Sequence, residues 1–179
     1  MSARKTIDSA QITHALEAMA DQLARAHRDT GALIVVGIAN GGIVLADRLA
    51  GLLAQKLGRS LATGVLSVAF QRDDIGLNPI PKETVPTHLP ADVDDATVLL
   101  VDDVIFSGRT IRAAIEELFS MGRPSRVQLA VLVDRGNRRL PFAPDVTGFV
   151  EPTDPDEKVT VALDRNHPEL DAIHILPSA

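Results

Sequence analysis

The sequence predicts an α/β protein with a mostly parallel central sheet and helices on both of its faces. Two observations support this fold class. Strand-like and helix-like segments alternate from residue 32 to residue 133, which is the order of consecutive β-α-β units. The strand-like segments are also short and continuously apolar, as expected for strands that are covered on both faces.

Length and composition favour one globular domain that spans residues 1–179. Of the 179 residues, 45% are hydrophobic and 23% are charged, and the formal net charge is −6. No apolar run reaches the ~18 residues of a membrane span, and the first residues lack the apolar core of a signal peptide, so we expect a cytoplasmic protein. The absence of cysteine excludes disulfides, Cys-ligated metal sites and a thiol nucleophile.

The first predicted element is an amphipathic helix over residues 9–28. Its apolar side chains recur at helical spacing on one face, and Asp8 or Ser9 is a suitable cap for its first turn. The elements that follow are predicted in this order: a strand at 32–36, a turn at 37–42, a helix at 43–57 that ends at Gly58, and a strand at 61–70.

Residues 71–95 differ from the rest of the chain because they contain four prolines and few apolar pairs. In a compact domain, an irregular stretch of this length is usually functional or mobile. The remaining elements are predicted in this order: a strand at 98–101, a helix at 109–121, a strand at 127–133, and shorter strands near 146–150, 158–163 and 172–176.

Residues 98–110, VLLVDDVIFSGRT, carry the clearest chemical signal. Asp102 and Asp103 come at the carboxyl end of an apolar strand, where parallel sheets bind ligands. Ser-Gly-Arg-Thr follows where a helix begins, and its unpaired N–H groups and hydroxyls favour an anion. A ribose 5-phosphate suits both halves, with its phosphate in the turn and its 2- and 3-hydroxyls on the carboxylates. The phosphate-binding candidates are Val104, Ile105, Phe106, Ser107, Gly108, Arg109 and Thr110.

The alternative for this segment is an ordinary strand–turn–helix with a capping serine and two solvated acids, which gives no reason for paired acids at a strand end. The segment resembles the phosphoribosyl diphosphate (PRPP) motif of type I phosphoribosyltransferases. Two further segments, AFQRDD at 69–74 and GRPSRVQLAVLVDRG at 122–136, are similar to the bifunctional pyrimidine-operon attenuation regulator and uracil phosphoribosyltransferase family. The similarity extends over nearly the whole chain, to EKVTVAL at 157–163.

This resemblance implies a fold and a reaction. The fold is that of type I phosphoribosyltransferases, with a small C-terminal hood whose strands lie over about residues 140–179. The reaction transfers phosphoribosyl from PRPP to uracil and releases UMP and pyrophosphate. Mg²⁺ would be bound through PRPP near Asp102 and Asp103, without direct protein ligands. The two aspartates and Arg72 are the catalytic candidates, because they face a transition state in which positive charge builds on the ribose and negative charge on the leaving group.

The resemblance also assigns residues to the pyrophosphate and the nucleobase. In the family, the loop after the first buried strand holds pyrophosphate, in some members through a cis peptide. Taken by themselves, the glycines of this loop would also fit a simple tight turn. Lys82 joins this site when the proline-rich segment closes, unless Arg72 and its neighbours are only an exposed charge cluster. The loop residues are Ala39, Asn40, Gly41 and Gly42, and the base-binding candidates are Asp134, Arg135, Phe149 and Val150. Phe149 either stacks on the base or belongs to the core of an edge strand.

The chain departs from the family pattern at several of these positions. Gly41 stands where the family commonly has an arginine in its pyrophosphate loop. Asn137 replaces the histidine of the D-R-G-H-R motif, and Phe149 and Val150 stand where lysine and asparagine are typical. The PRPP motif itself is intact.

A second function class is an RNA-binding regulator of transcription. Residues 109–139 contain seven arginines and three acids, whereas residues 140–179 contain eight acids and two basic residues. A homodimer or tetramer, as the family forms, would join two basic faces against an mRNA leader hairpin. Alternatively, these arginines cover helix surfaces and pair with acids. One protein can combine both functions by sensing UMP or UTP, and a third interpretation is a regulator with little or no transferase turnover.

Overall fold

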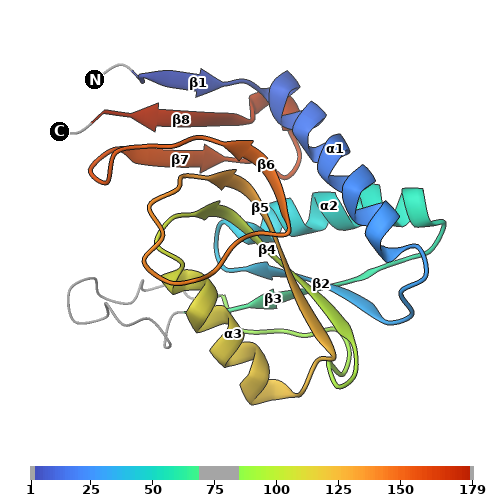
Figure 1. The fold of residues 1–179 in the computed structure, drawn as a ribbon. Helices are drawn as coiled ribbons and strands as arrows, with labels where there is room; N and C mark the ends of the chain where they lie inside the picture. The colour runs from blue at the N-terminus through green and yellow to red at the C-terminus, as the bar shows by residue number, and fades with distance from the viewer. Residues whose placement is uncertain (1–2, 69–84, 178–179) are drawn as a thin grey trace.

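The computed structural model describes residues 3–68 and 85–177, and its main layer is a five-stranded sheet (Figure 1). The strand order is β3-β2-β4-β5-β6, and every neighbouring pair is parallel. The predicted fold class is therefore confirmed. The strands are β2 (Leu33–Ile38), β3 (Ala62–Leu66), β4 (Thr97–Ile105), β5 (Arg126–Asp134) and β6 (Val146–Val150).

Helices cover both faces of this sheet (Figure 1). The helices α1 (Ser9–His27) and α2 (Gly42–Leu57) pack on one face, and α3 (Arg109–Met121) packs on the other. Successive residues of β4 point to opposite faces, so Leu99 and Val101 pack with α1 and α2 while Val98 and Leu100 pack with α3. Because both faces are buried, these strands are apolar without alternation.

A second, smaller sheet forms the hood. It contains β1 (Lys5–Ile7), β8 (Ala172–Leu176) and β7 (Lys158–Ala162), all antiparallel, with a short 3-10 helix, η1 (Pro168–Leu170), before β8. The strands that form the hood differ from those in the predicted span of 140–179. The strand β6 belongs to the main sheet, and the N-terminal β1 completes the hood by pairing Thr6 with His174.

The strands that carry the site are longer than the apolar runs suggest. Strand β4 was expected at 98–101, but its ladder with β5 continues until Ile105 pairs with Asp134. Asp102 and Asp103 therefore lie inside the strand and not beyond its end, so the hydrogen-bonded backbone fixes their directions. The ladder continues past the apolar run because parallel pairing requires backbone groups and not apolar side chains.

The end of β3 and the proline-rich segment are described only in part. Strand β3 ends at Leu66, short of the predicted residue 70, and Val65 then forms an isolated bridge with His88. Arg72 and Lys82 lie outside the described residues, so their predicted roles stay predictions. Among the described helices, none has the length and apolar character that crossing a bilayer requires.

Candidate active site

The paired acids near the end of β4 form the centre of the site. Asp102 is 5% exposed, and its Oδ1 accepts a hydrogen bond of 3.0 Å from the backbone N–H of Asp103. Burial raises the pKa of Asp102 well above its usual range, and the neighbouring Asp103 carboxylate raises it further. Burial also raises the pKa of Asp103. Among the residues that the structure describes, no basic side chain forms an ion pair with either acid.

The turn after β4 has the geometry expected of an anion site. Gly108, just before α3, has φ 88°, a left-handed conformation that glycine adopts without steric cost. The N-cap residue Gly108 supplies no side-chain cap, and the Ser107 hydroxyl accepts only a long hydrogen bond of 3.4 Å from the N–H of Arg109. The start of the helix, with the positive end of its dipole, therefore keeps N–H groups available to an anion. The carbonyl of Ser107 accepts hydrogen bonds of 3.0 Å from the N–H groups of Arg139 and Leu140, which fix the turn against the segment after β5.

The glycine loop after β2 lies directly against the acids. Its Ala39–Asn40 peptide bond is cis, as in some members of the family. A Cβ on Gly42 would lie 2.1 Å from the carbonyl oxygen of Val101, so only glycine allows the loop to approach β4 this closely. The structure therefore brings the predicted pyrophosphate loop and the predicted ribose-binding acids to the same edge of the sheet.

The residues after β5 are held by internal contacts. Asp134 forms an ion pair of 2.6 Å with Arg138 and accepts a hydrogen bond of 2.8 Å from the N–H of Gly136. Arg138 also donates to the carbonyl of Phe106 over 2.8 Å. The predicted contact of Asp134 with a nucleobase stays a prediction, because its carboxylate has these partners within the chain.

Phe149 and Val150, the other predicted base contacts, occupy different environments. Phe149 lies in the edge strand β6, where it pairs with Val133 of β5. Its side chain packs against the core that α1 and α2 cover. This position favours the core alternative for its ring. Val150, the next residue, is 69% exposed.

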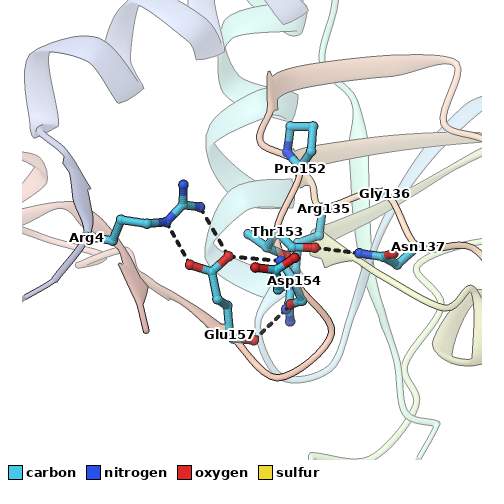
Figure 2. Close-up of a pocket in the computed structure, with 8 residues that line it drawn as sticks. All are labelled: Arg4, Arg135, Gly136, Asn137, Pro152, Thr153, Asp154 and Glu157. Atoms are coloured by element: carbon cyan, nitrogen blue, oxygen red, sulfur yellow. Dashed lines mark hydrogen bonds and ion pairs between the residues drawn. The ribbon is translucent and has the colours of Figure 1, made fainter. Parts of the chain in front are cut away.

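A hollow of about 340 Å³ opens beside these residues, between the end of β5 and residues 151–157, which we call the hood loop (Figure 2). Its wall is polar. Arg4 reaches it from the N-terminal segment and pairs with Glu157 over 2.7 Å, and Asn137 donates to the carbonyl of Thr153 over 2.6 Å. The lining residues are Arg4, Arg135, Gly136, Asn137, Pro152, Thr153, Asp154 and Glu157. Sequence reasoning did not find the roles of Arg4 and Glu157, because no local pattern links residues so far apart.

Comparisons with known proteins agree with this geometry. The phosphoribosyl transferase domain family matches residues 7–164. A protein of Syntrophobacter fumaroxidans named "Bifunctional protein PyrR" is 42% identical over 163 residues, which cover 89% of this chain and 86% of the relative. The chain belongs to the PyrR family of phosphoribosyltransferases. A PyrR protein of Roseiflexus is 36% identical and covers 98% of this chain and 96% of its own length.

Solved structures share the fold of this PyrR-family chain at much lower identity. The hypoxanthine phosphoribosyltransferase of Trypanosoma cruzi matches with a TM-score of 0.72 and 17% identity, covering 99% of this chain and 98% of the other. A hypoxanthine-guanine phosphoribosyltransferase of Bacillus anthracis has a TM-score of 0.66, covering 85% and 86%. The predicted type I phosphoribosyltransferase fold is thereby confirmed.

Proposed function

We propose that this protein transfers the phosphoribosyl group of PRPP to uracil in the cytoplasm, forming UMP and pyrophosphate. One observation carries the proposal: the buried Asp102 and the half-buried Asp103, which have no basic partner among the described residues, share one edge of the sheet with the start of α3 and a glycine loop. A phosphorylated ribose with a pyrophosphate leaving group has a binding partner for each of these three features: hydroxyls for the acids, a phosphate for the helix start and pyrophosphate for the glycine loop. The resemblance of the sequence to the attenuation regulator and uracil phosphoribosyltransferase family supports uracil as the acceptor.

Each part of the site has a distinct task in this reaction. The turn from Val104 to Thr110 binds the 5-phosphate through backbone N–H groups and the Ser107 and Thr110 hydroxyls. Asp102 and Asp103 accept hydrogen bonds from the ribose hydroxyls and stabilise the positive charge that builds on the ribose as the bond to pyrophosphate breaks. The glycine loop from Ala39 to Gly42 receives the pyrophosphate, with Arg72 and Lys82 as its proposed cations.

The acid pair suits Mg²⁺ that arrives with PRPP. Carboxylate oxygens are the ligands that Mg²⁺ prefers, and a nearby cation offsets the repulsion and burial that raise the pKa of Asp102. The described residues contain no cluster of three or more acidic or histidine side chains that would bind an ion alone. We propose that PRPP oxygens and water would supply its ligands near Asp102 and Asp103, and that the ion would contribute positive charge beside the pyrophosphate.

The base would lie between the end of β5 and the hood. Asp134, Phe149 and Val150 remain the proposed contacts, and Val150 is more exposed than the partly buried Phe149. The guanidinium of Arg135, the fourth candidate, contacts the hood loop and Phe106 instead. A direct assay tests the proposal: labelled uracil, PRPP and Mg²⁺ are incubated with the protein, and UMP is measured. Hypoxanthine in place of uracil is the matched control. UMP formed from uracil without IMP formed from hypoxanthine supports the proposal, and no product from uracil together with no PRPP binding by calorimetry overturns it.

We also propose a second function, regulation of pyrimidine genes through an mRNA leader hairpin, because the relatives are named bifunctional. The seven arginines of residues 109–139 differ in burial and in ion pairing. Arg135 is buried and Arg138 and Arg112 pair with acids, while Arg109, Arg123, Arg126 and Arg139 are exposed.

An RNA mobility-shift assay with and without UMP or UTP tests this second function, with sedimentation to identify a homodimer or tetramer. Specific binding requires that a leader hairpin outcompete an unrelated hairpin and that the nucleotide change its affinity. Equal affinity for both hairpins, with a steep fall as salt rises, would show only non-specific phosphate contact.

A further inference from the structure

The side chain of Arg135 lies between two functional segments. On one side it holds the hood loop: Nε donates to Oγ1 of Thr153 over 2.9 Å, and Nη2 donates to the carbonyls of Asp154 and Glu157. On the other side, the guanidinium lies 4.4 Å from the centre of the Phe106 ring, in the phosphate-binding turn. Figure 2 shows Arg135 beside the hood-loop residues that it contacts.

The surroundings of Arg135 distinguish it from an ordinary surface arginine. The residue is 9% exposed, and burial lowers its pKa. Its neighbour Arg138 pairs with the Asp134 carboxylate, whereas the guanidinium of Arg135 contacts backbone carbonyls, a hydroxyl and an aromatic face. These contacts require a planar group with several donors in fixed directions, which lysine does not provide.

The backbone connects the same segments. The N–H of Arg135 donates to the carbonyl of Ile105, directly before Phe106, over 3.1 Å. The N–H of Thr153 donates to the carbonyl of Arg135 over 3.3 Å. Two backbone hydrogen bonds through Arg135 therefore connect the hood loop to the proposed 5-phosphate turn, so a shift of the loop can move the turn.

We infer that Arg135 is a positioning residue that couples nucleobase binding under the hood loop to 5-phosphate binding in the turn. This inference rests on the proposed function, since it assumes that one nucleotide occupies both segments. A base that orders the hood loop also fixes the guanidinium, and the guanidinium fixes Phe106 and the turn. Binding of each half of the nucleotide then favours binding of the other.

Two probes separate the halves of the site. UMP reaches both the hood and the turn, whereas ribose 5-phosphate reaches only the turn and the acids. Calorimetry would measure both dissociation constants for the wild type, Arg135→Lys, Phe106→Leu and the double variant. Lys5→Gln is the matched control, because Lys5 pairs with Glu151 of the same loop but does not line the hollow and has no described contact with the turn. Thermal melting identifies any variant that does not fold.

The expected result is a selective loss of UMP affinity. Arg135→Lys and Phe106→Leu should each weaken UMP binding about tenfold and ribose 5-phosphate binding less than about threefold, while Lys5→Gln stays within about threefold for both. Because the two residues act through one contact, the double variant should be little weaker than either single variant.

Three results would overturn the inference: additive losses in the double variant, equal losses in Lys5→Gln and Arg135→Lys, or unchanged UMP binding in Arg135→Lys. If Arg135→Lys does not fold, Phe106→Leu decides alone, and an equal loss for both probes counts against the coupling. A wild type that binds ribose 5-phosphate but not UMP would instead contradict the proposed function.

Discussion

The carboxylate of Asp103 occupies the space that a side chain at position 41 would fill. A Cβ built on Gly41 would lie 2.2 Å from Oδ2 and 2.6 Å from Oδ1 of Asp103. Where the family commonly has an arginine, this chain thus has direct contact between the proposed pyrophosphate loop and Asp103, a proposed ribose-binding acid. The described loop carries no cation of its own at this point, so Gly41 and Asp103 form one unit of the site.

Gly41→Ala should therefore reduce activity by moving the Asp103 carboxylate. The added methyl group forces the carboxylate to rotate away, and a displacement of about 1 Å at a reacting centre costs about 100-fold in rate. The measurement is kcat/KM for PRPP in the uracil assay. Gly51→Ala is the matched control, because nothing lies within 4 Å of a Cβ at that helical position. Equal activity of both variants would show that the contact has no catalytic role.

Asp103→Asn should lower kcat sharply in a folded protein. The amide keeps the shape of the carboxylate but not the negative charge that stabilises the ribose cation, and loss of such a preorganised group costs about 100-fold or more. Asp47→Asn provides the comparison at an exposed carboxylate. An unchanged kcat in Asp103→Asn would remove this residue from the mechanism.

Asp102→Asn should increase the stability of the folded protein. Because the pKa of Asp102 is raised in the folded protein, folding favours its protonated form, and stability falls as the pH rises above 3.8 toward the raised value. The neutral amide avoids this loss, so at pH 7 we expect a higher Tm than that of the wild type. Melting curves at pH 5 and pH 8 measure it. A gain that does not increase with pH would contradict the assigned cause.

The site was largely predictable because its signals are local. The acids, the Ser-Gly-Arg-Thr turn and the apolar run before them lie within residues 98–110, and parallel pairing places them at one edge of the sheet. Contacts across the chain were not predictable in this way. Strand β1 joins the hood by pairing with residues near the other terminus, and the direction of the Arg135 side chain depends on the hood loop and on Phe106.

His27 should make the protein sensitive to mild acid. The ring is fully buried at the end of α1, its Nδ1 lies 3.2 Å from Oγ1 of Thr30, and Nε2 has no hydrogen-bond partner. Burial, with the charges of Arg126 and Arg59, lowers the pKa of His27, and only Asp145 opposes them. The unfolded chain therefore binds a proton more readily, and stability should fall as the pH drops below about 6.5.

Replacement of this ring should remove that dependence. In His27→Gln, the difference in Tm between pH 7.5 and pH 5.5 should shrink relative to the wild type, because no proton is taken up at this position on unfolding. His14→Gln, at an exposed position of the same helix, should keep the wild-type difference. If both variants show the same pH dependence, the acid sensitivity arises elsewhere.

Two arginine–aspartate pairs join α2 to the hood region, and they should differ strongly in their contribution to stability. Arg48 pairs with Asp171, whose side chain is 0% exposed, and also donates to the carbonyl of Asp164. Asp47 pairs with Arg165 over 3.0 Å, but these side chains are 45% and 63% exposed. Water solvates the second pair when it is broken, whereas breaking the first leaves a charge in the interior.

Arg48→Ala should therefore destabilise the protein by about 3–5 kcal/mol, because the Asp171 carboxylate stays buried without its partner. Arg165→Ala should change the free energy of unfolding by less than about 1 kcal/mol, as is usual for exposed pairs. Chemical denaturation measures both. Since Asp171 also accepts the N–H of Asp164 over 2.9 Å, the double variant Arg48→Met with Asp171→Leu should recover only part of the loss. Similar losses in the two single variants would show that burial of Asp171 does not determine the strength of this connection.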